Sequence, residues 1–386
     1  MKKIISIIVL VCVMALSLTS CDMVMDVINK VTGKEPTEQK EPYDPNKEVF
    51  DGALKLIEDG NIEEAYDILK GLEGYEPAEA ELEKFYFVPV SFNATAEGVS
   101  ILSYDIEYNE RDLLSKLTTN QDGKVYVWEF TYDDNGNMIR STTSNIWGEL
   151  QATMVQEFDE NNNVIEATAE YEDGRFEYEE YTYNSDGKLI NYVYTDYKGI
   201  TTTIEYTYSS DGEHVIREHL KTDGNTQTTT RVYDTEGKIL EETIRVPAQT
   251  LVITTQYTYN ENGIISKKTV SGKYKYAEIL TEVYTYDENG NLKDSQVKTT
   301  TDNTYRSYAY NKDNQCVIML VSTAQGRINV TYTYDKYGSI VKLEEVHRGT
   351  TIGEMEVEWK MVYFANGLPK QTQDIVDSVD KALKLQ

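Results

Sequence analysis

Cysteine and proline are scarce in this sequence. The chain has three cysteines and seven prolines among 386 residues. Two of the cysteines, Cys12 and Cys21, lie within the first 21 residues, so Cys316 has no disulfide partner in the rest of the chain. We therefore expect a fold that is stabilised by apolar burial and backbone hydrogen bonds.

Basic residues are also in short supply. The chain has 37 lysines and arginines against 66 acidic residues, which gives a formal net charge of −29. Such a surface repels phosphate groups, so we do not expect nucleic acid as a partner. In contrast, tyrosine is abundant at 31 residues, and this composition favours β-strands.

The first 21 residues have the layout of a bacterial lipoprotein signal. Lys2 and Lys3 precede an apolar stretch over residues 4–18, which is too short to span a bilayer comfortably. The sequence Leu18-Thr19-Ser20-Cys21 resembles a lipobox. The resemblance implies a signal peptide at 1–20, acylation of Cys21 and an extracytoplasmic, membrane-anchored chain. The alternative is an ordinary secretory signal that contains a cysteine by chance.

Two segments precede the main part of the chain. Residues 21–45 combine several prolines with charged residues, which predicts a flexible tether after the lipidated cysteine. Residues 46–87 have apolar residues at helical spacing, with a break at residues 59–61, and predict a helical hairpin plus a third helix that runs through Phe85. Residues 47–85 resemble one tetratricopeptide unit. Because such repeats stack in threes or more, we expect a cap or docking element here.

Residues 88–370 repeat one pattern eleven times. An aromatic residue, here called the anchor, is followed by a turn-forming sequence, and successive anchors are 24 to 29 residues apart. A regular period of this length predicts a repeat architecture. The anchors are Tyr108, Tyr132, Phe158, Tyr183, Tyr208, Tyr233, Tyr259, Tyr286, Tyr310, Tyr334 and Tyr363.

The fourth residue after each anchor is glycine, asparagine or aspartate. These residues tolerate the positive φ of a hairpin loop that a left-handed residue closes. A second, shorter break, such as residues 197–199, divides each unit into two strands, so we expect about 22 strands. The glycines are Gly136, Gly187, Gly212, Gly237, Gly263, Gly290, Gly338 and Gly367, and the other three residues are Asp112, Asn162 and Asn314.

The motif Tyr-Thr-Tyr-Asp-x-x-Gly-x-Leu, as in residues 284–292, resembles the tyrosine–aspartate (YD) repeats of bacterial Rhs and related wall-associated proteins. The resemblance implies a long spiralling β-sheet, which the largest members close around a toxin domain. We therefore predict a mainly β protein: an elongated or spiralling array of hairpins after a small helical hairpin, with residues 371–386 as a tail or short helix. The array is short and no toxin domain follows it, so we do not expect an enclosed cargo.

Alternation along the strands predicts one tyrosine-rich face and one threonine-rich face. Tyr286, Tyr284 and Leu280 share the first, whereas Thr285 and Val283 share the second. Such a sheet is half buried. The tyrosines then form a structural ladder, or some of them lie exposed as a binding surface.

Residues that make up catalytic or metal sites are few. His214 and Cys316 both lie six residues after an anchor, where other units have an apolar residue, so we expect both to be packed. His219 lies five residues after His214, which places the two on opposite faces of a strand. Turns such as residues 133–137 lack the distal glutamate of a calcium loop. We expect no catalytic residue, metal site or cofactor.

These observations predict a non-enzymatic, lipid-anchored protein at the bacterial cell surface. Its β-repeat surface serves adhesion or the binding of a glycan or protein ligand, and its membrane contact is the lipid on Cys21. The first alternative is a structural or assembly component of the cell envelope. An Rhs-like shell fragment accessory to a toxin system and a polysaccharide-directed enzyme are further alternatives.

Overall fold

The computed structural model describes residues 44–272, 280–299 and 301–384, and it divides into two compact units at residues 79 and 80. Cys21 and the lipobox residues lie outside the described residues. Every helix among the described residues is too short or too polar to span a lipid bilayer.

The first unit contains a helical hairpin. Helix α3 (Pro45–Glu58) starts with the Asp44 side chain, which accepts a hydrogen bond from the Asn46 N–H at 2.9 Å. Helix α4 (Ile62–Lys70) packs against α3, and Ala53 and Ala65 are both fully buried. Small buried side chains allow two helices to approach closely. Helix α5 (Glu76–Leu82) crosses the boundary between the two units.

The second unit is a 22-stranded antiparallel sheet in which each strand pairs with its neighbours in the sequence. The strands are β1 (Phe85–Ala96), β2 (Val99–Tyr108), β3 (Leu114–Gln121), β4 (Lys124–Tyr132), β5 (Met138–Asn145), β6 (Leu150–Phe158), β7 (Val164–Tyr171), β8 (Phe176–Tyr183), β9 (Leu189–Thr195), β10 (Thr201–Tyr208), β11 (Val215–Thr222), β12 (Asn225–Tyr233), β13 (Ile239–Val246), β14 (Leu251–Tyr259), β15 (Ile265–Gly272), β16 (Leu280–Tyr286), β17 (Leu292–Lys298), β18 (Asn303–Tyr310), β19 (Cys316–Thr323), β20 (Gly326–Tyr334), β21 (Ile340–His347) and β22 (Thr350–Tyr363). A short 3-10 helix (Pro247–Gln249) connects β13 to β14.

The sheet closes on itself, which corrects the prediction of an elongated or spiralling array. Strand β1 pairs with β22 from Phe85↔Tyr363 to Ala96↔Gly353, so the first and last hairpins meet. This seam gives the two end strands backbone partners on both sides. The mainly β fold was predicted correctly. Closure was not, because an internal period specifies how neighbours pair but not whether the two ends meet.

The boundary between helices and strands also differs from the prediction. Helix α5 ends at Leu82, and Phe85 is the first residue of β1 instead of part of the third helix. The Phe85 ring packs edge-on against Tyr363, with ring centroids 5.3 Å apart. The Phe364 N–H donates to the Lys84 carbonyl at 2.9 Å, which extends the seam by one bond.

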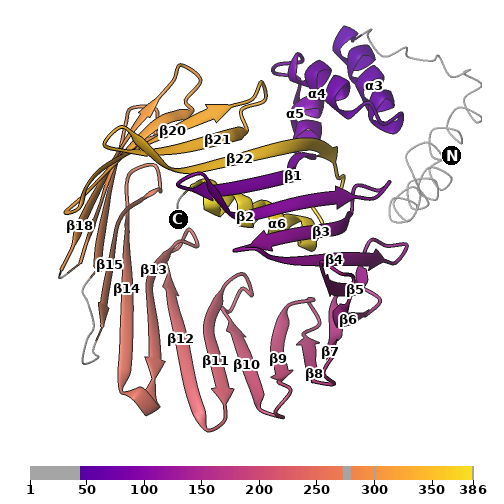
Figure 1. Cartoon of the computed structure of the whole chain (residues 1–386), viewed down its shortest axis with the longest axis vertical. Helices are drawn as coiled ribbons and strands as arrows, with labels where there is room; N and C mark the ends of the chain where they lie inside the picture. Colours follow the sequence, from indigo (N-terminus) through magenta and orange to yellow (C-terminus); the bar gives the residue numbers. More distant parts are fainter. Residues whose placement is uncertain (1–43, 273–279, 300, 385–386) are drawn as a thin grey trace, which may run out of the picture. The chain divides into compact units, whose positions relative to one another are not determined.

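The C-terminal helix α6 (Lys370–Leu383) packs on one face of the closed sheet, and Figure 1 shows it on the inner side of the curved strands. Val379 and Leu383 are buried in a cluster with Phe92, Val330 and Leu343. These strand residues alternate in phase with the anchors. We therefore call the face that carries the anchors the inner face.

Candidate functional site

The anchor tyrosines form a ladder of hydrogen bonds along one rim of the sheet. Nine of the ten anchor hydroxyls donate to a backbone carbonyl earlier in the chain. The acceptor is the first residue of the strand that follows the preceding anchor's turn or, for Tyr108, Pro89. The O···O distances are 2.6 to 3.1 Å. The pairs are Tyr108–Pro89, Tyr132–Leu114, Tyr183–Val164, Tyr208–Leu189, Tyr233–Val215, Tyr259–Ile239, Tyr286–Ile265, Tyr310–Leu292 and Tyr334–Cys316.

Two units vary this ladder. Phe158 has no hydroxyl to donate. In the last unit the Trp359 indole N–H donates to the Ile340 carbonyl at 2.7 Å, whereas the Tyr363 hydroxyl donates to the Glu81 carboxylate. Burial raises the pKa of Tyr310 and of Tyr334 to about 12. The hydroxyls of the ladder are therefore hydrogen-bond donors that the fold itself uses.

The turn after each anchor is built from a left-handed residue and side-chain hydrogen bonds. All eleven residues four positions after an anchor have positive φ, from 57° at Asp112 to 94° at Gly338. The Asp234 carboxylate accepts the backbone N–H groups of Glu236 at 2.8 Å and Lys238 at 2.9 Å. The Lys238 N–H contributes most to lowering the pKa of Asp234. The turn aspartates, despite their superficial likeness to those of calcium loops, therefore bind backbone donors.

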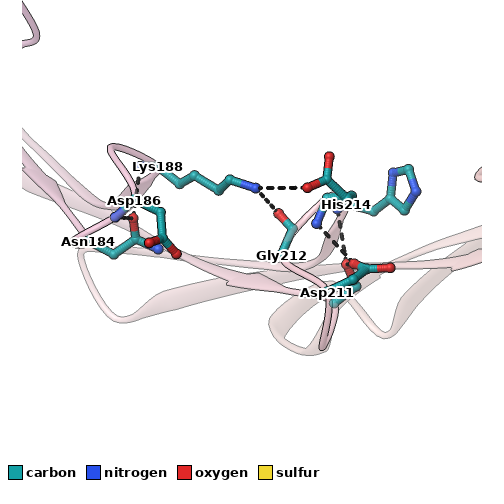
Figure 2. Close-up of polar contacts among 8 residues, drawn as sticks. Asn184, Asp186, Lys188, Asp211, Gly212 and His214 are labelled. Carbon is teal, nitrogen blue, oxygen red and sulfur yellow. Dashed lines mark hydrogen bonds and ion pairs between the residues drawn. The ribbon is translucent and has the colours of Figure 1, made fainter. Parts of the chain in front are cut away.

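Neighbouring turns are also joined to each other. Figure 2 shows Lys188 reaching the next turn, where its Nζ contacts the Gly212 carbonyl and lies 3.7 Å from the Glu213 carboxylate. The Asn137 amide donates to the Asn162 side chain at 2.9 Å in the same way. Side chains thus join several pairs of neighbouring turns along this rim.

His214 does not occupy the apolar position that was expected for it. The turn after Tyr208 is one residue longer than its equivalents, so Val215 pairs with Tyr208 and His214 is the last residue of the turn. The His214 ring instead stacks on the next anchor, Tyr233, with centroids 4.5 Å apart at 18°. The equal spacing of six residues concealed this insertion, because counting cannot distinguish a longer turn from a substituted strand residue.

The remaining histidine and cysteine positions have packing partners. His219 lies 2.9 Å from the Thr228 hydroxyl, away from His214. Cys316 is half-buried at the start of β19, and burial raises the pKa of its thiol. Among the described residues, no group of three or more histidine, cysteine or acidic side chains is arranged to hold a metal ion.

Where α6 does not cover it, the inner face carries ion pairs among its tyrosines. Arg231 Nη1 lies 2.5 Å from the Glu218 carboxylate, and its Nε lies 2.8 Å from Glu242. Lys268 on β15 lies 3.5 Å from the carboxylate of Glu282 on the neighbouring strand β16. These cross-strand pairs give the cations of this stretch carboxylate partners, so the inner face here is polar.

A pocket of about 810 Å³ lies on the inner face across β3–β7. The register places Trp128, Thr143, Ala152 and Tyr171 in one cross-strand row, and all four residues line the pocket. The hollow exists because β5–β7 carry small inner-face residues here. Strand β9, by contrast, has Tyr192 and Tyr194 at the positions that Ser141 and Thr143 occupy on β5. The wall therefore consists of aromatic rings beside small polar side chains.

Aromatic and hydrogen-bonding groups also surround the mouth of the pocket. Tyr126 packs on Trp128 with centroids 5.9 Å apart and is 38% exposed. The Arg175 guanidinium lies 4.6 Å from the Tyr171 ring centre and 5.2 Å from that of Tyr197. Asp173 accepts from Arg175 Nε at 2.7 Å and so fixes this stack. The arrangement offers flat apolar faces together with amide, hydroxyl and guanidinium donors.

The sequence analysis did not single out the pocket residues. Trp128 lies four residues before its anchor Tyr132, so alternation along the strand already placed both side chains on the same face. The signal that could have found the pocket is the run of small residues opposite it, Ser141, Ala152 and Ala169. A local loss of side-chain volume within a repeat marks a hollow in the packed face.

The chain shows only limited similarity to known proteins. No protein-family model and no curated protein matches the chain. A structure of the Photorhabdus luminescens Tc holotoxin pore with a TccC3 mutation is 12% identical, with a TM-score of 0.40, and the overlap covers 71% of this chain and 19% of that one. A crystal structure of TcdB2-TccC3 is 14% identical, with a TM-score of 0.39, over 68% of this chain and 16% of that one.

A porin-like protein from Bacteroides uniformis is also similar. It is 10% identical, with a TM-score of 0.23, and the overlap covers 71% of this chain and 96% of that one. This chain spans about a fifth of the length of the Tc holotoxin chain. The β-repeat fold described above rests on the strand pairings, and no function is transferred from these proteins.

Proposed function

We propose that this chain is a non-enzymatic, lipid-anchored surface protein that binds oligosaccharides in the pocket over β3–β7. The observation that supports the proposal is the pocket wall, where Tyr126, Trp128 and Tyr171 accompany small polar side chains. Apolar faces of sugar rings stack on aromatic rings, while sugar hydroxyls bond to amides and hydroxyls. A few such polar groups beside aromatic surface are typical of small-molecule sites.

The composition of the pocket favours binding over catalysis. Asp122 is the one carboxylate among its lining residues. Glycoside hydrolysis normally uses a pair of carboxylic groups that flank the scissile bond. We therefore propose capture of the sugar without cleavage, and no cofactor takes part.

The proposed location rests on the lipobox resemblance at residues 18–21. Acylation of Cys21 would hold the chain at the outer side of the cytoplasmic membrane or at the cell surface. Replacing Cys21 with serine should release the protein from the membrane fraction, with loss of the acyl mass at the N-terminus. Retention of Cys21→Ser with the membrane would contradict acylation of this residue.

The binding experiment uses the mature chain, residues 21–386, with Cys21→Ser to prevent acylation. Its binding to an oligosaccharide panel at physiological salt should be saturable. Tyr126→Ala and Gln151→Ala change the pocket mouth without entering the buried clusters, and each should weaken binding at least fivefold. Tyr305→Ala is the matched control, because Tyr305 is a 49% exposed tyrosine on the outer face of β18.

Failure to bind any oligosaccharide would favour the alternatives. The hydrogen-bonded anchor ladder suits a structural or assembly component of the envelope, since its tyrosines serve the fold. A shell fragment accessory to a toxin system is less well supported, because α6 of the same chain already occupies part of the inner face. Capture of an envelope protein by the same mature chain would identify the structural alternative.

A further inference from the structure

The turn between β5 and β6 exposes two large apolar side chains. Trp147 is 81% exposed and Ile146 is 61% exposed. No other large apolar side chain in the described part of the chain is as exposed as Trp147. Isolated apolar residues on a surface need no explanation, but an adjacent isoleucine and tryptophan at the tip of a turn form a compact apolar projection.

The turn holds this projection in one conformation. The Asn145 side-chain oxygen accepts the N–H groups of Trp147 and Glu149, both at 3.0 Å. The Asn145 backbone donates to the Glu149 carbonyl at 3.0 Å, and Gly148 adopts a φ of 78°. A preformed tip loses little conformational entropy when it binds a surface.

Folding does not require apolar residues at this tip. The turn between β7 and β8 closes with the same backbone hydrogen bond and carries Glu172 and Asp173 in place of Ile146 and Trp147. The corresponding turn between β9 and β10 carries Tyr197 and Lys198. The pair Ile146-Trp147 is therefore a local departure from a turn that forms equally well with charged side chains.

We propose that the Ile146-Trp147 turn inserts into the interfacial region of a lipid bilayer with neutral headgroups. Tryptophan is enriched at the membrane–water interface, where its ring is buried and its N–H stays hydrated. A net charge of −29 disfavours binding to anionic lipids, so burial of the two apolar side chains must supply the attraction to the membrane. The inference rests on the proposed lipid anchor, which keeps the chain at a high effective concentration beside the membrane.

The test measures partitioning of the mature Cys21→Ser chain onto phosphatidylcholine vesicles by sedimentation, with tryptophan emission in parallel. The double variant Ile146→Ser/Trp147→Ser should lower the partition coefficient at least tenfold. Val99→Ser is the matched control, because Val99 is 66% exposed beside another short turn. This control should partition like the parent chain, and added phosphatidylglycerol should weaken partitioning of the parent.

Three outcomes would overturn the inference. The first is equal partitioning of the parent and the double variant, and the second is no partitioning of either. The third is evidence that the turn contacts something other than a membrane. The parent would then not bind vesicles, and the double variant would lose oligosaccharide binding or would dissociate a dimer that the parent forms. The oligosaccharide assay with Tyr126→Ala is independent of vesicles, so it shows separately whether the proposed function fails.

Discussion

The inner face of the closed sheet differs between the strands that α6 covers and the strands that it does not. In the covered arc, β1–β3 with β19–β22, the buried inner residues are apolar, and Val330 and Leu343 are at most 1% exposed. In the uncovered arc, β8–β18, the buried inner residues are Thr229, Thr255 and Ser295. Backbone pairing continues through both arcs without a change of pattern.

This difference distinguishes the residues that set strand pairing from the residues that cover the inner face. The anchor ladder and the left-handed turn residues recur in both arcs, together with the same strand pairing. The inner residues instead match their surroundings: apolar where a helix packs, tyrosine, threonine and ion pairs elsewhere. One repeat can therefore support a helix-covered core, a polar stretch and a pocket in a single sheet.

The largest expected effect comes from placing a charge under α6. Val379→Asp puts an unpaired carboxylate into the cluster around Leu343, where Val379 is fully buried. We expect a loss of about 3 kcal/mol or more in the free energy of unfolding. Amide hydrogen exchange should rise in the covered arc before the uncovered arc. Lys381→Ala, at an exposed position of α6, is the control. If hydrogen exchange in Val379→Asp rose equally in both arcs, the two arcs would not differ in what stabilises them.

A pair of truncations compares the arcs directly. Leu343→Ala removes a fully buried side chain beside α6 and should destabilise the protein by roughly 2–5 kcal/mol. Thr255 lies on the inner face of the uncovered arc. Thr255→Ala should lower the free energy of unfolding by about 1 kcal/mol or less, because little apolar volume is lost. Chemical denaturation measures both. Equal effects would show that the uncovered arc has a core of its own.

Local pattern predicted most of this fold. The spacing of the anchors and the residues that tolerate positive φ, such as Asn162 and Asn314, depend on short-range backbone geometry, which the sequence displays directly. Alternation also assigned Tyr284 and Thr285 to opposite faces. These features need no knowledge of distant contacts.

Closure, helix coverage and the pocket depend on distant contacts, and the sequence analysis missed them. The seam joins Phe85 to Tyr363, and no local signal connects two strands so far apart. A tail or short helix was expected at residues 371–386, but the docking face of the helix at residues 370–383 becomes evident only beside the apolar rows of β20 and β21. The pocket likewise needs the register that aligns Trp128 with Ala152 and Tyr171.

High pH tests the inner tyrosines of the uncovered arc. Burial, followed by nearby carboxylates, raises the pKa of Tyr192 and of Tyr194 to about 12. Because the folded pKa lies above the unfolded value near 10, this stabilisation is complete below pH 10 and is lost as the pH rises through 12. Denaturation from pH 8 to 12 should show this fall. Tyr192→Phe/Tyr194→Phe should reduce its slope, and an unchanged slope would contradict the assignment to these residues.

The last comparison concerns the ladder that both arcs share. Tyr259→Phe in the uncovered arc and Tyr334→Phe in the covered arc each remove a hydroxyl that donates at 2.7 Å to a carbonyl. Each should destabilise the protein by about 0.5–1.5 kcal/mol, and the two losses should be alike because both hydroxyls make the same bond to the carbonyl at the start of a strand. Phe158→Tyr offers the reverse change, since it restores a donor at the one anchor without a hydroxyl, and thermal denaturation should show a small gain. A clearly larger loss for Tyr334→Phe would mean that helix coverage strengthens the rim as well as the core, and the separation between pairing and filling would fail.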